Sequence, residues 1–146
     1  MSRDGCRTPM PWTPGPGHGF TDPDVTPWLA FGEDAETRNV ETLMGDAGST
    51  LNLVRHLLAL RRRRPSLHRG TIAFIDDAPD GVLAYVRQFG EEETTVLINF
   101  ANATATVPIS TRATVLVSTD GDSRLAEGCL HLAPHAAVVA APGPVN

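Results

Sequence analysis

The sequence predicts a mainly β protein in which an irregular segment and one α-helix precede an antiparallel β-sandwich domain. Three observations carry this prediction. Residues 1–46 are rich in proline and glycine and have no hydrophobic period, residues 49–64 carry apolar side chains at helical spacing, and from residue 71 the period changes to two. We therefore expect a division into residues 1–70 and a β-domain of residues 71–146.

Composition and charge disfavour several classes of protein. The chain has 146 residues, 41% hydrophobic and 20% charged, which is typical of a globular protein. A net charge of −5 does not favour nucleic-acid binding. No apolar run reaches the roughly 20 residues of a membrane span, and the first residues lack the apolar core of a signal peptide, so we expect a cytoplasmic protein. A complete (β/α)₈ barrel needs about 250 residues and cannot fit.

The first 46 residues are expected to form a loop. Six prolines fall between Pro9 and Pro27, and each lacks an amide donor and disfavours helix at the preceding residue. Both tryptophans of the chain, Trp12 and Trp28, lie in the same stretch. A plain linker would expose this apolar surface, so we expect the loop to pack against something, with both indoles as packing residues.

Residues 49–64 are expected to form the single helix. Ser49 or Thr50 can cap its start, Arg61–Arg64 suit the negative end of the helix dipole, and Pro65 stops it. Four consecutive arginines could also bind nucleic acid or another anion. The negative net charge favours the first interpretation, a helix end with some arginines paired to nearby carboxylates.

The remainder reads as short strands separated by turns, without an intervening helix, which is typical of an antiparallel sandwich or small barrel. Both faces of residues 82–89 are largely apolar, so we expect a central strand there. Glu91–Glu93 are expected to be solvated at a hairpin tip. The expected strands are 71–75, 82–89, 94–100, 103–108, 113–118, 129–132 and 136–141.

The sequence predicts no metal site and no cofactor. Cys6 and Cys129 are the only cysteines, and two isolated cysteines make neither a disulfide framework nor a metal site, so we expect reduced thiols. His131 and His135 flank Pro134 in a strand-like stretch, which argues against a helical metal-binding pair.

The most specific motif is Arg3-Asp4-Gly5-Cys6-Arg7-Thr8-Pro9-Met10-Pro11-Trp12. Guanidinium groups bind carboxylates in fixed orientations, and an indole can stack on a sugar ring or fill a core. The segment resembles the Arg-Asp-x-x-Arg-Thr-Pro-Met-x-Trp motif of α-glucosidases in glycoside hydrolase family 13. The resemblance continues in order through stretches near residues 19–20, 27–29, 39–41, 49–70, 82–87, 95–100 and 132–136.

This resemblance implies that residues 1–70 are the end of a catalytic (β/α)₈ barrel, with an active-site loop and the last helix, and that residues 71–146 are the C-terminal β-domain. In the family, the first arginine of the motif pairs with an aspartate from early in the barrel and binds the glucose at the non-reducing end. Arg3 matches that position, and Arg7 would line the same pocket or hold the loop. Both are therefore the expected substrate-binding residues.

The family's catalytic carboxylates lie before this motif, and no residue of this chain matches them. We therefore expect the C-terminal portion of an α-glucosidase-type hydrolase acting on α-linked gluco-oligosaccharides. It would be inactive alone and would have the missing barrel as its partner. The start at Met1 is expected to reflect a fragment, a split gene or a truncated reading frame.

Two alternatives stay open. One is a free-standing β-sandwich that binds carbohydrate, for which Tyr85 and Phe89 lie on one face of a strand. The other is one half of a split glucosidase, completed by a separately encoded barrel.

Overall fold

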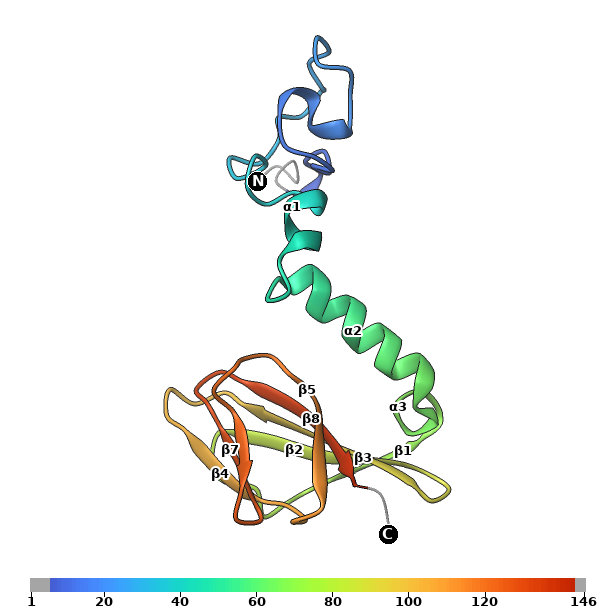
Figure 1. Ribbon diagram of the computed structural model, residues 1–146, viewed down its shortest axis with the longest axis vertical. Coiled ribbons are helices and arrows are strands. Elements are labelled where there is room, and N and C mark those ends of the chain that lie inside the picture. Colours follow the sequence, from blue (N-terminus) through green and yellow to red (C-terminus); the bar gives the residue numbers. More distant parts are fainter. Residues whose placement is uncertain (1–5, 144–146) are drawn as a thin grey trace. The chain divides into compact units, whose positions relative to one another are not determined.

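The computed structural model describes residues 6–143 (Figure 1). The chain forms two compact units, one ending at Arg55 and the other beginning at His56, and both limits fall within one helix. Each unit is described by itself. The division after residue 70, which the change of hydrophobic period and the family resemblance both indicate, stays a prediction. None of the described helices is long and apolar enough to cross a membrane.

The first unit contains more helix than the sequence predicts. A short 3₁₀ helix, η2, spans Pro16–Gly19, and helix α1 spans Val40–Gly45. The prediction of an irregular segment through residue 46 is wrong for these two elements. Helix α1 forms because Asn39 caps it, with its side-chain oxygen accepting a hydrogen bond from the Thr42 amide at 2.9 Å.

Helix α2 spans Thr50–Arg63, within one residue of the prediction at each end. The Ser49 hydroxyl accepts a hydrogen bond from the Asn52 amide at 3.2 Å, which confirms Ser49 as the N-cap. Pro65 ends α2 as predicted, but it also begins a further helix, α3 (Pro65–Arg69). Proline is tolerated in a first helical turn, where its missing amide has no helical partner to lose.

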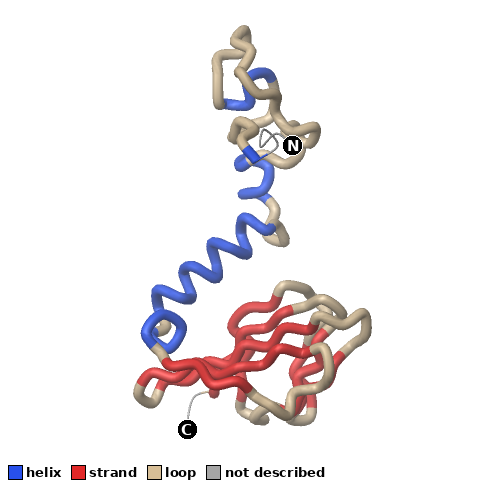
Figure 2. Tube along the Cα trace, turned by 180° about the vertical axis from the view of Figure 1, so that it is seen from behind, coloured by secondary structure: helices blue, strands red, loops and turns tan. Residues whose placement is uncertain are grey.

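The second unit contains two antiparallel sheets, which confirms the predicted β-sandwich (Figures 1 and 2). The five-stranded sheet has the order β1-β2-β3-β8-β5, and the three-stranded sheet has the order β4-β7-β6. The strands are β1 (Thr71–Phe74), β2 (Val82–Phe89), β3 (Glu92–Asn99), β4 (Ala105–Pro108), β5 (Ala113–Ser118), β6 (Arg124–Ala126), β7 (Cys129–Leu132) and β8 (Ala137–Pro142).

Strands β3, β4 and β6 differ most from the sequence-based expectation: β4 begins at Ala105 rather than at residue 103, and the limits of β1 and β8 differ by one residue. Strand β6 was not expected, because three residues are too few for a period of two to show. Strand β3 begins at Glu92 rather than at residue 94. Strand β2 lies between β1 and β3, as its two apolar faces predicted.

The core lies between the two sheets. The five-stranded sheet and the three-stranded sheet each contribute side chains that are at least 97% buried, and Leu130 and Leu132 are fully inaccessible. Strands β2, β3, β4, β7 and β8 each turn one face toward this core, as the alternation of side chains requires, whereas all four residues of β1 are exposed. The buried cluster consists of Ala84, Leu97, Val107, Leu130, Leu132, Val138 and Ala140.

A polar cluster, here called the Arg64 cluster (Arg64, Ser66, Glu92, Glu93 and Thr94), attaches α3 to the β2–β3 hairpin. Arg64 donates from Nε to Thr94 Oγ1 at 2.8 Å and from Nη2 to the Glu93 carbonyl at 2.9 Å. The Ser66 amide donates to Glu92 Oε1 at 2.7 Å, and the Ser66 and Thr94 hydroxyls, both fully buried, lie 2.8 Å apart. The glutamates of this hairpin were expected to be solvated, which is wrong for Glu92. One arginine of the run is paired with a carboxylate, as expected.

Candidate substrate-binding loop

Of the two predicted substrate-binding residues, the structure describes one. Arg3 lies outside the described residues. Arg7 is exposed and lies two residues before Pro9, which is buried. The role of both residues in substrate binding stays a prediction.

The end of the motif is attached to the first turn of α1. The Pro11 carbonyl accepts a hydrogen bond from the Val40 amide at 3.1 Å, and the Trp12 carbonyl accepts one from the Glu41 amide at 2.9 Å. These are amides that a helix start leaves without an intrahelical partner, and the next amide, that of Thr42, is bonded to the cap residue Asn39. The start of α1 therefore fixes the backbone that follows Arg7.

Asn39 also holds the second half of the loop. Its side chain is 1% exposed, and Nδ2 donates to the Ala35 carbonyl at 3.2 Å and to the Glu36 carbonyl at 2.9 Å. Glu36 in turn accepts a hydrogen bond from the Gly15 amide at 3.0 Å. Residues 11–15 and 35–42 thus form one hydrogen-bonded frame. In the sequence analysis Asn39 appeared only within the family resemblance, and its role as a helix cap was not predicted. The available signal was an asparagine at the start of a stretch without proline.

A tight turn follows the motif. The His18 carbonyl accepts hydrogen bonds from the amides of Trp12 and Thr13, at 2.8 and 3.2 Å. His18 has a left-handed φ of 47°, and its ring packs edge-on against Phe31 with the centroids 4.5 Å apart. Phe20 also packs edge-on against Phe31, with the ring centroids 6.1 Å apart. The loop is therefore built around its own small aromatic cluster.

The two tryptophans do not fill a core of this chain. Trp28 is 97% exposed, and Trp12 is 49% exposed. The described residues of this chain therefore do not cover the two indoles, and the expectation that they pack against the missing part of the barrel stays a prediction. Exposed large aromatic side chains on an ordered loop indicate surface that meets a partner or a ligand.

The carbohydrate platform considered for the β-domain is not an open aromatic surface. The guanidinium carbon of Arg69 lies 4.6 Å from the centroid of the Phe89 ring, so a cation already occupies that ring face. Tyr85 lies in edge contact with Phe74, with the centroids 6.1 Å apart. The geometry therefore does not favour a free-standing carbohydrate-binding module.

The described residues contain no cluster of histidine, cysteine, aspartate and glutamate that could hold a metal ion. Cys6 and Cys129 are not bonded to each other, in line with the expected thiols. His131 contacts the Thr106 hydroxyl and His135 contacts Asn102, at 3.1 and 2.6 Å. Both histidines therefore have polar partners within the β-domain.

Among the carboxyl groups of residues 6–143, those of Glu92 and Asp120 have clearly shifted pKa values, and both shifts oppose a role as general acid. Burial raises the pKa of Glu92, but hydrogen bonds from Ser66 and the charge of Arg64 outweigh burial and place the pKa below its usual range. Burial likewise raises the pKa of Asp120, and hydrogen bonds from Ser123, Asp122 and Ser118 bring it below normal. A glycosidase acid needs a raised pKa, because it must hold a proton at neutral pH.

The lowered pKa of Glu92 predicts a pH-dependent contribution to stability. A carboxyl whose pKa is lower in the folded state than in the unfolded state stabilises the fold above its unfolded value, near 4.5, and loses that contribution as the pH falls through the folded value. We expect the free energy of unfolding of Glu92→Gln to lie below that of the unmodified chain at pH of about 7, and the difference to shrink as the pH falls below 4.5. Urea titrations at pH of about 7 and at a series of pH values below 4.5 measure it. An unchanged difference at low pH would contradict a charged Glu92 in the Arg64 cluster.

Comparison with known proteins identifies the family. Residues 1–70 match the family model of the α-amylase catalytic domain, and residues 82–139 match that of the C-terminal domain of the α-amylase SusG. The chain belongs to the α-amylase family, glycoside hydrolase family 13. The two matches lie in the order that the sequence motifs predicted, which confirms the resemblance.

Individual family members place the chain near the α-glucosidases. It is 38% identical over 104 residues to a probable α-glucosidase of Rhizobium meliloti and 34% identical over 104 residues to a probable oligo-1,6-glucosidase of Bacillus subtilis. Each alignment covers 71% of this chain and 18% of the relative. The crystal structure of trehalulose synthase from Pseudomonas mesoacidophila superposes with a TM-score of 0.80 at 26% identity, covering 96% of this chain and 26% of that one. The chain thus spans less than a fifth of the curated relatives it matches.

Proposed function

We propose that this chain supplies the C-terminal part of an α-glucosidase-type hydrolase that acts on α-linked gluco-oligosaccharides. The observation that carries the proposal is the catalytic-domain match over residues 1–70, which contain the motif and the hydrogen-bonded loop frame. Glucosidases of this family are among the relatives, and a variant of the similar trehalulose synthase was solved with its substrate sucrose.

In this proposal the loop contributes to recognition rather than to bond cleavage. Arg3 and Arg7 donate to hydroxyl or carboxylate oxygens at the closed end of the glucose site, and guanidinium groups suit that task because their donors are fixed in one plane. The hydrogen bonds between α1 and residues 11–12 fix the backbone that follows Arg7. A site built on such hydrogen bonds discriminates against sugars that lack the matching hydroxyl.

The catalytic carboxylates come from the part of the catalytic domain that this chain does not contain. A retaining glycosidase needs two carboxyl groups about 5–5.5 Å apart, one of them with a raised pKa. No aspartate or glutamate of this chain lies in a motif that matches the family's catalytic residues. The partner is therefore the remaining barrel, encoded in the same chain or, as in the split-enzyme alternative, separately. Residence in the cytoplasm also stays a prediction.

We expect the isolated chain to release no glucose from maltose and no nitrophenol from p-nitrophenyl α-glucoside. The measurement is steady-state hydrolysis by the purified chain, with the Rhizobium meliloti relative assayed in parallel as the positive control. Turnover that co-purifies with the isolated chain through two chromatographic steps would contradict the absence of catalytic carboxylates.

A further inference from the structure

Helix α1, which holds the end of the motif, cannot be stable by its own length. It has six residues, whereas an isolated helix needs roughly 12–15 residues to be even marginally stable in water. None of its six side chains is buried, so packing does not hold it either. The stability of α1 therefore depends on the groups that form hydrogen bonds with its two ends.

The C-terminal end of α1 is bonded by Asn52, a residue of the first turn of α2. Asn52 is 9% exposed, and its Nδ2 lies 2.7 Å from the Asp46 carbonyl oxygen. The same nitrogen lies 3.1 Å from the carbonyl oxygens of Leu43 and Met44, two acceptors that a helix end leaves without an intrahelical donor. The Ser49 hydroxyl also donates to the Leu43 carbonyl, at 2.6 Å. One side-chain amide and one hydroxyl thus satisfy this end of the helix.

Two asparagines therefore bond the two ends of α1 in opposite senses. At the start, Asn39 accepts a hydrogen bond from a helix amide, and at the end Asn52 donates to helix carbonyls. The amides of Val40 and Glu41, which hold the motif backbone, belong to the first turn. Six residues make less than two helical turns, and helix formation is cooperative, so the loss of the bonds at one end loosens the other.

We propose that Asn52 is a positioning residue for Arg7, on which it acts through α1 rather than by contact. The α1 amides hold the carbonyls of Pro11 and Trp12, and this backbone follows Arg7. Without the donors of Asn52, the end of α1 loses its hydrogen bonds and the helix opens. The guanidinium group of Arg7 then loses its fixed approach to the sugar. Only this last step, sugar binding by Arg7, rests on the proposed function.

Amide hydrogen exchange of the intact chain tests the link, with the amides of Val40 and Glu41 as reporters. Asn52→Ala removes the side chain. Asn52→Asp keeps its shape, but an ionised carboxylate has no donor and places a negative charge against the three carbonyls. We expect each variant to raise the exchange rates of both reporter amides by about tenfold or more, because buried carbonyls without donors favour local opening.

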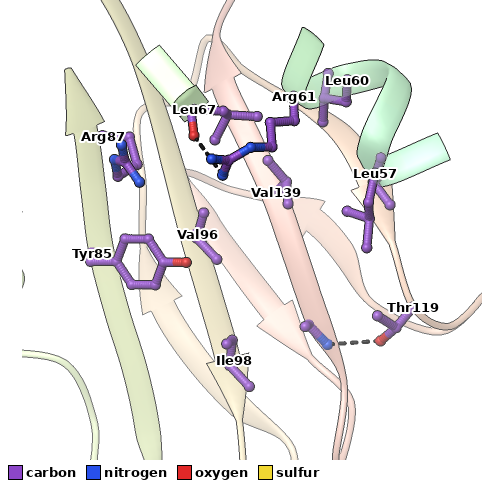
Figure 3. Close-up of a pocket in the computed structure, with 12 residues that line it drawn as sticks. Leu57, Leu60, Arg61, Leu67, Tyr85, Arg87, Val96, Ile98, Thr119 and Val139 are labelled. Carbon is purple, nitrogen blue, oxygen red and sulfur yellow. Dashed lines mark hydrogen bonds between the residues drawn. The ribbon is translucent and has the colours of Figure 1, made fainter. Parts of the chain in front are cut away.

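Two matched controls change other side chains of α2. Arg55→Ala removes the guanidinium group that contacts Asn52 Oδ1 at 3.3 Å and leaves the Nδ2 contacts in place. Leu57→Ala shortens a side chain that lines an apolar groove of the second unit, between α2, α3 and the five-stranded sheet (Figure 3). It weakens the packing of α2 at residues that do not bond α1. We expect both controls to change the exchange rates of the reporter amides by less than about twofold.

The consequence for sugar binding is measured in a chimera, in which this chain replaces the aligned segment of the Rhizobium meliloti α-glucosidase. We expect Asn52→Ala to raise KM for maltose by about tenfold and to lower kcat by less than about threefold, because a displaced Arg7 weakens binding of the ground state and the transition state alike. A merely structural role would instead reduce the amount of folded enzyme, which lowers the apparent kcat at unchanged KM. Arg55→Ala should leave both parameters within about twofold.

Protection of the amides of Leu97 and Leu130, in the core of the β-domain, shows whether each variant is folded. Three outcomes overturn the proposal. They are reporter exchange that both Asn52 variants leave unchanged, equal acceleration by the two controls, and equal acceleration of the core amides, which would make the effect general. An active chimera in which Asn52→Ala leaves KM unchanged would overturn the positioning of Arg7. A chimera that releases no glucose counts against the proposed function instead, and the exchange rates of the isolated chain then decide the role of Asn52 by themselves.

Discussion

Replacing Asn99 with alanine is expected to lower the free energy of unfolding of the β-domain by about 2–4 kcal/mol. The side chain is 1% exposed and lies at the end of β3. Nδ2 donates to the carbonyls of Ala103 and Ala133, at 2.8 and 2.9 Å, and also contacts the Leu132 carbonyl at 3.3 Å. Oδ1 accepts a hydrogen bond from the Ala101 amide at 3.0 Å.

The large effect follows from the groups that the substitution would leave behind. Asn99 connects the end of β3, in the five-stranded sheet, to the end of β7, in the three-stranded sheet. Alanine would leave an amide and several carbonyls without partners, and each buried unpaired group costs about 1–3 kcal/mol. The midpoint and slope of urea unfolding measure the loss.

Asn102→Ala is the matched control. Asn102 is exposed, and its side chain contacts only the His135 ring, at 2.6 Å, among the described residues. We expect its effect to be within about 0.5 kcal/mol, as is usual for surface substitutions. Equal losses for the two asparagines, or a loss below about 1 kcal/mol for Asn99→Ala, would contradict the role of Asn99 in joining the sheets.

The second large effect is expected on activity, in a complete enzyme that contains this chain. Arg3→Ala should lower kcat/KM for maltose by roughly 30- to 4,000-fold, because removing one partner of a buried charged pair costs about 2–5 kcal/mol. In the proposed function, Arg3 pairs with an aspartate of the barrel and closes the glucose site. Removing it would leave that aspartate buried and unpaired.

The enzyme for this measurement is a chimera in which the present chain replaces the aligned segment of the Rhizobium meliloti α-glucosidase. Arg124→Ala, which changes an exposed residue of the edge strand β6, is the control and should leave kcat/KM within about twofold. Unchanged kcat/KM for Arg3→Ala would remove Arg3 from the substrate site. Equal losses for both variants would indicate damage to the fold instead.

The sequence predicted the elements in which the hydrophobic pattern repeats over many residues and whose ends are marked by capping or turn residues. Helix α2 was predicted within one residue because its apolar spacing runs over three turns and both Ser49 and Pro65 mark its limits. The two-sheet domain followed from alternation and turn residues. Helix α1, with six residues, and β6, with three, are shorter than the window in which a period can be recognised.

The polar contacts could not be predicted, because their partners lie far apart in sequence. Ser66 and Thr94 are 28 positions apart, and Asn99 is 34 positions from Ala133. No local pattern distinguishes such an asparagine or glutamate from a solvated one, so Glu92 was taken for a surface charge. The loop motif was found by resemblance, while its attachment through Asn39 and α1 came only from the structure.

The central claim is that this chain can serve as the C-terminal part of an α-glucosidase, and the hydrolysis of maltose and isomaltose by the unmodified chimera tests it most directly. We predict that the chimera releases glucose from at least one of the two sugars. The isolated chain, and the Rhizobium meliloti α-glucosidase without its aligned segment, should release none. A chimera that is folded and monodisperse but releases no glucose from either sugar would contradict the claim.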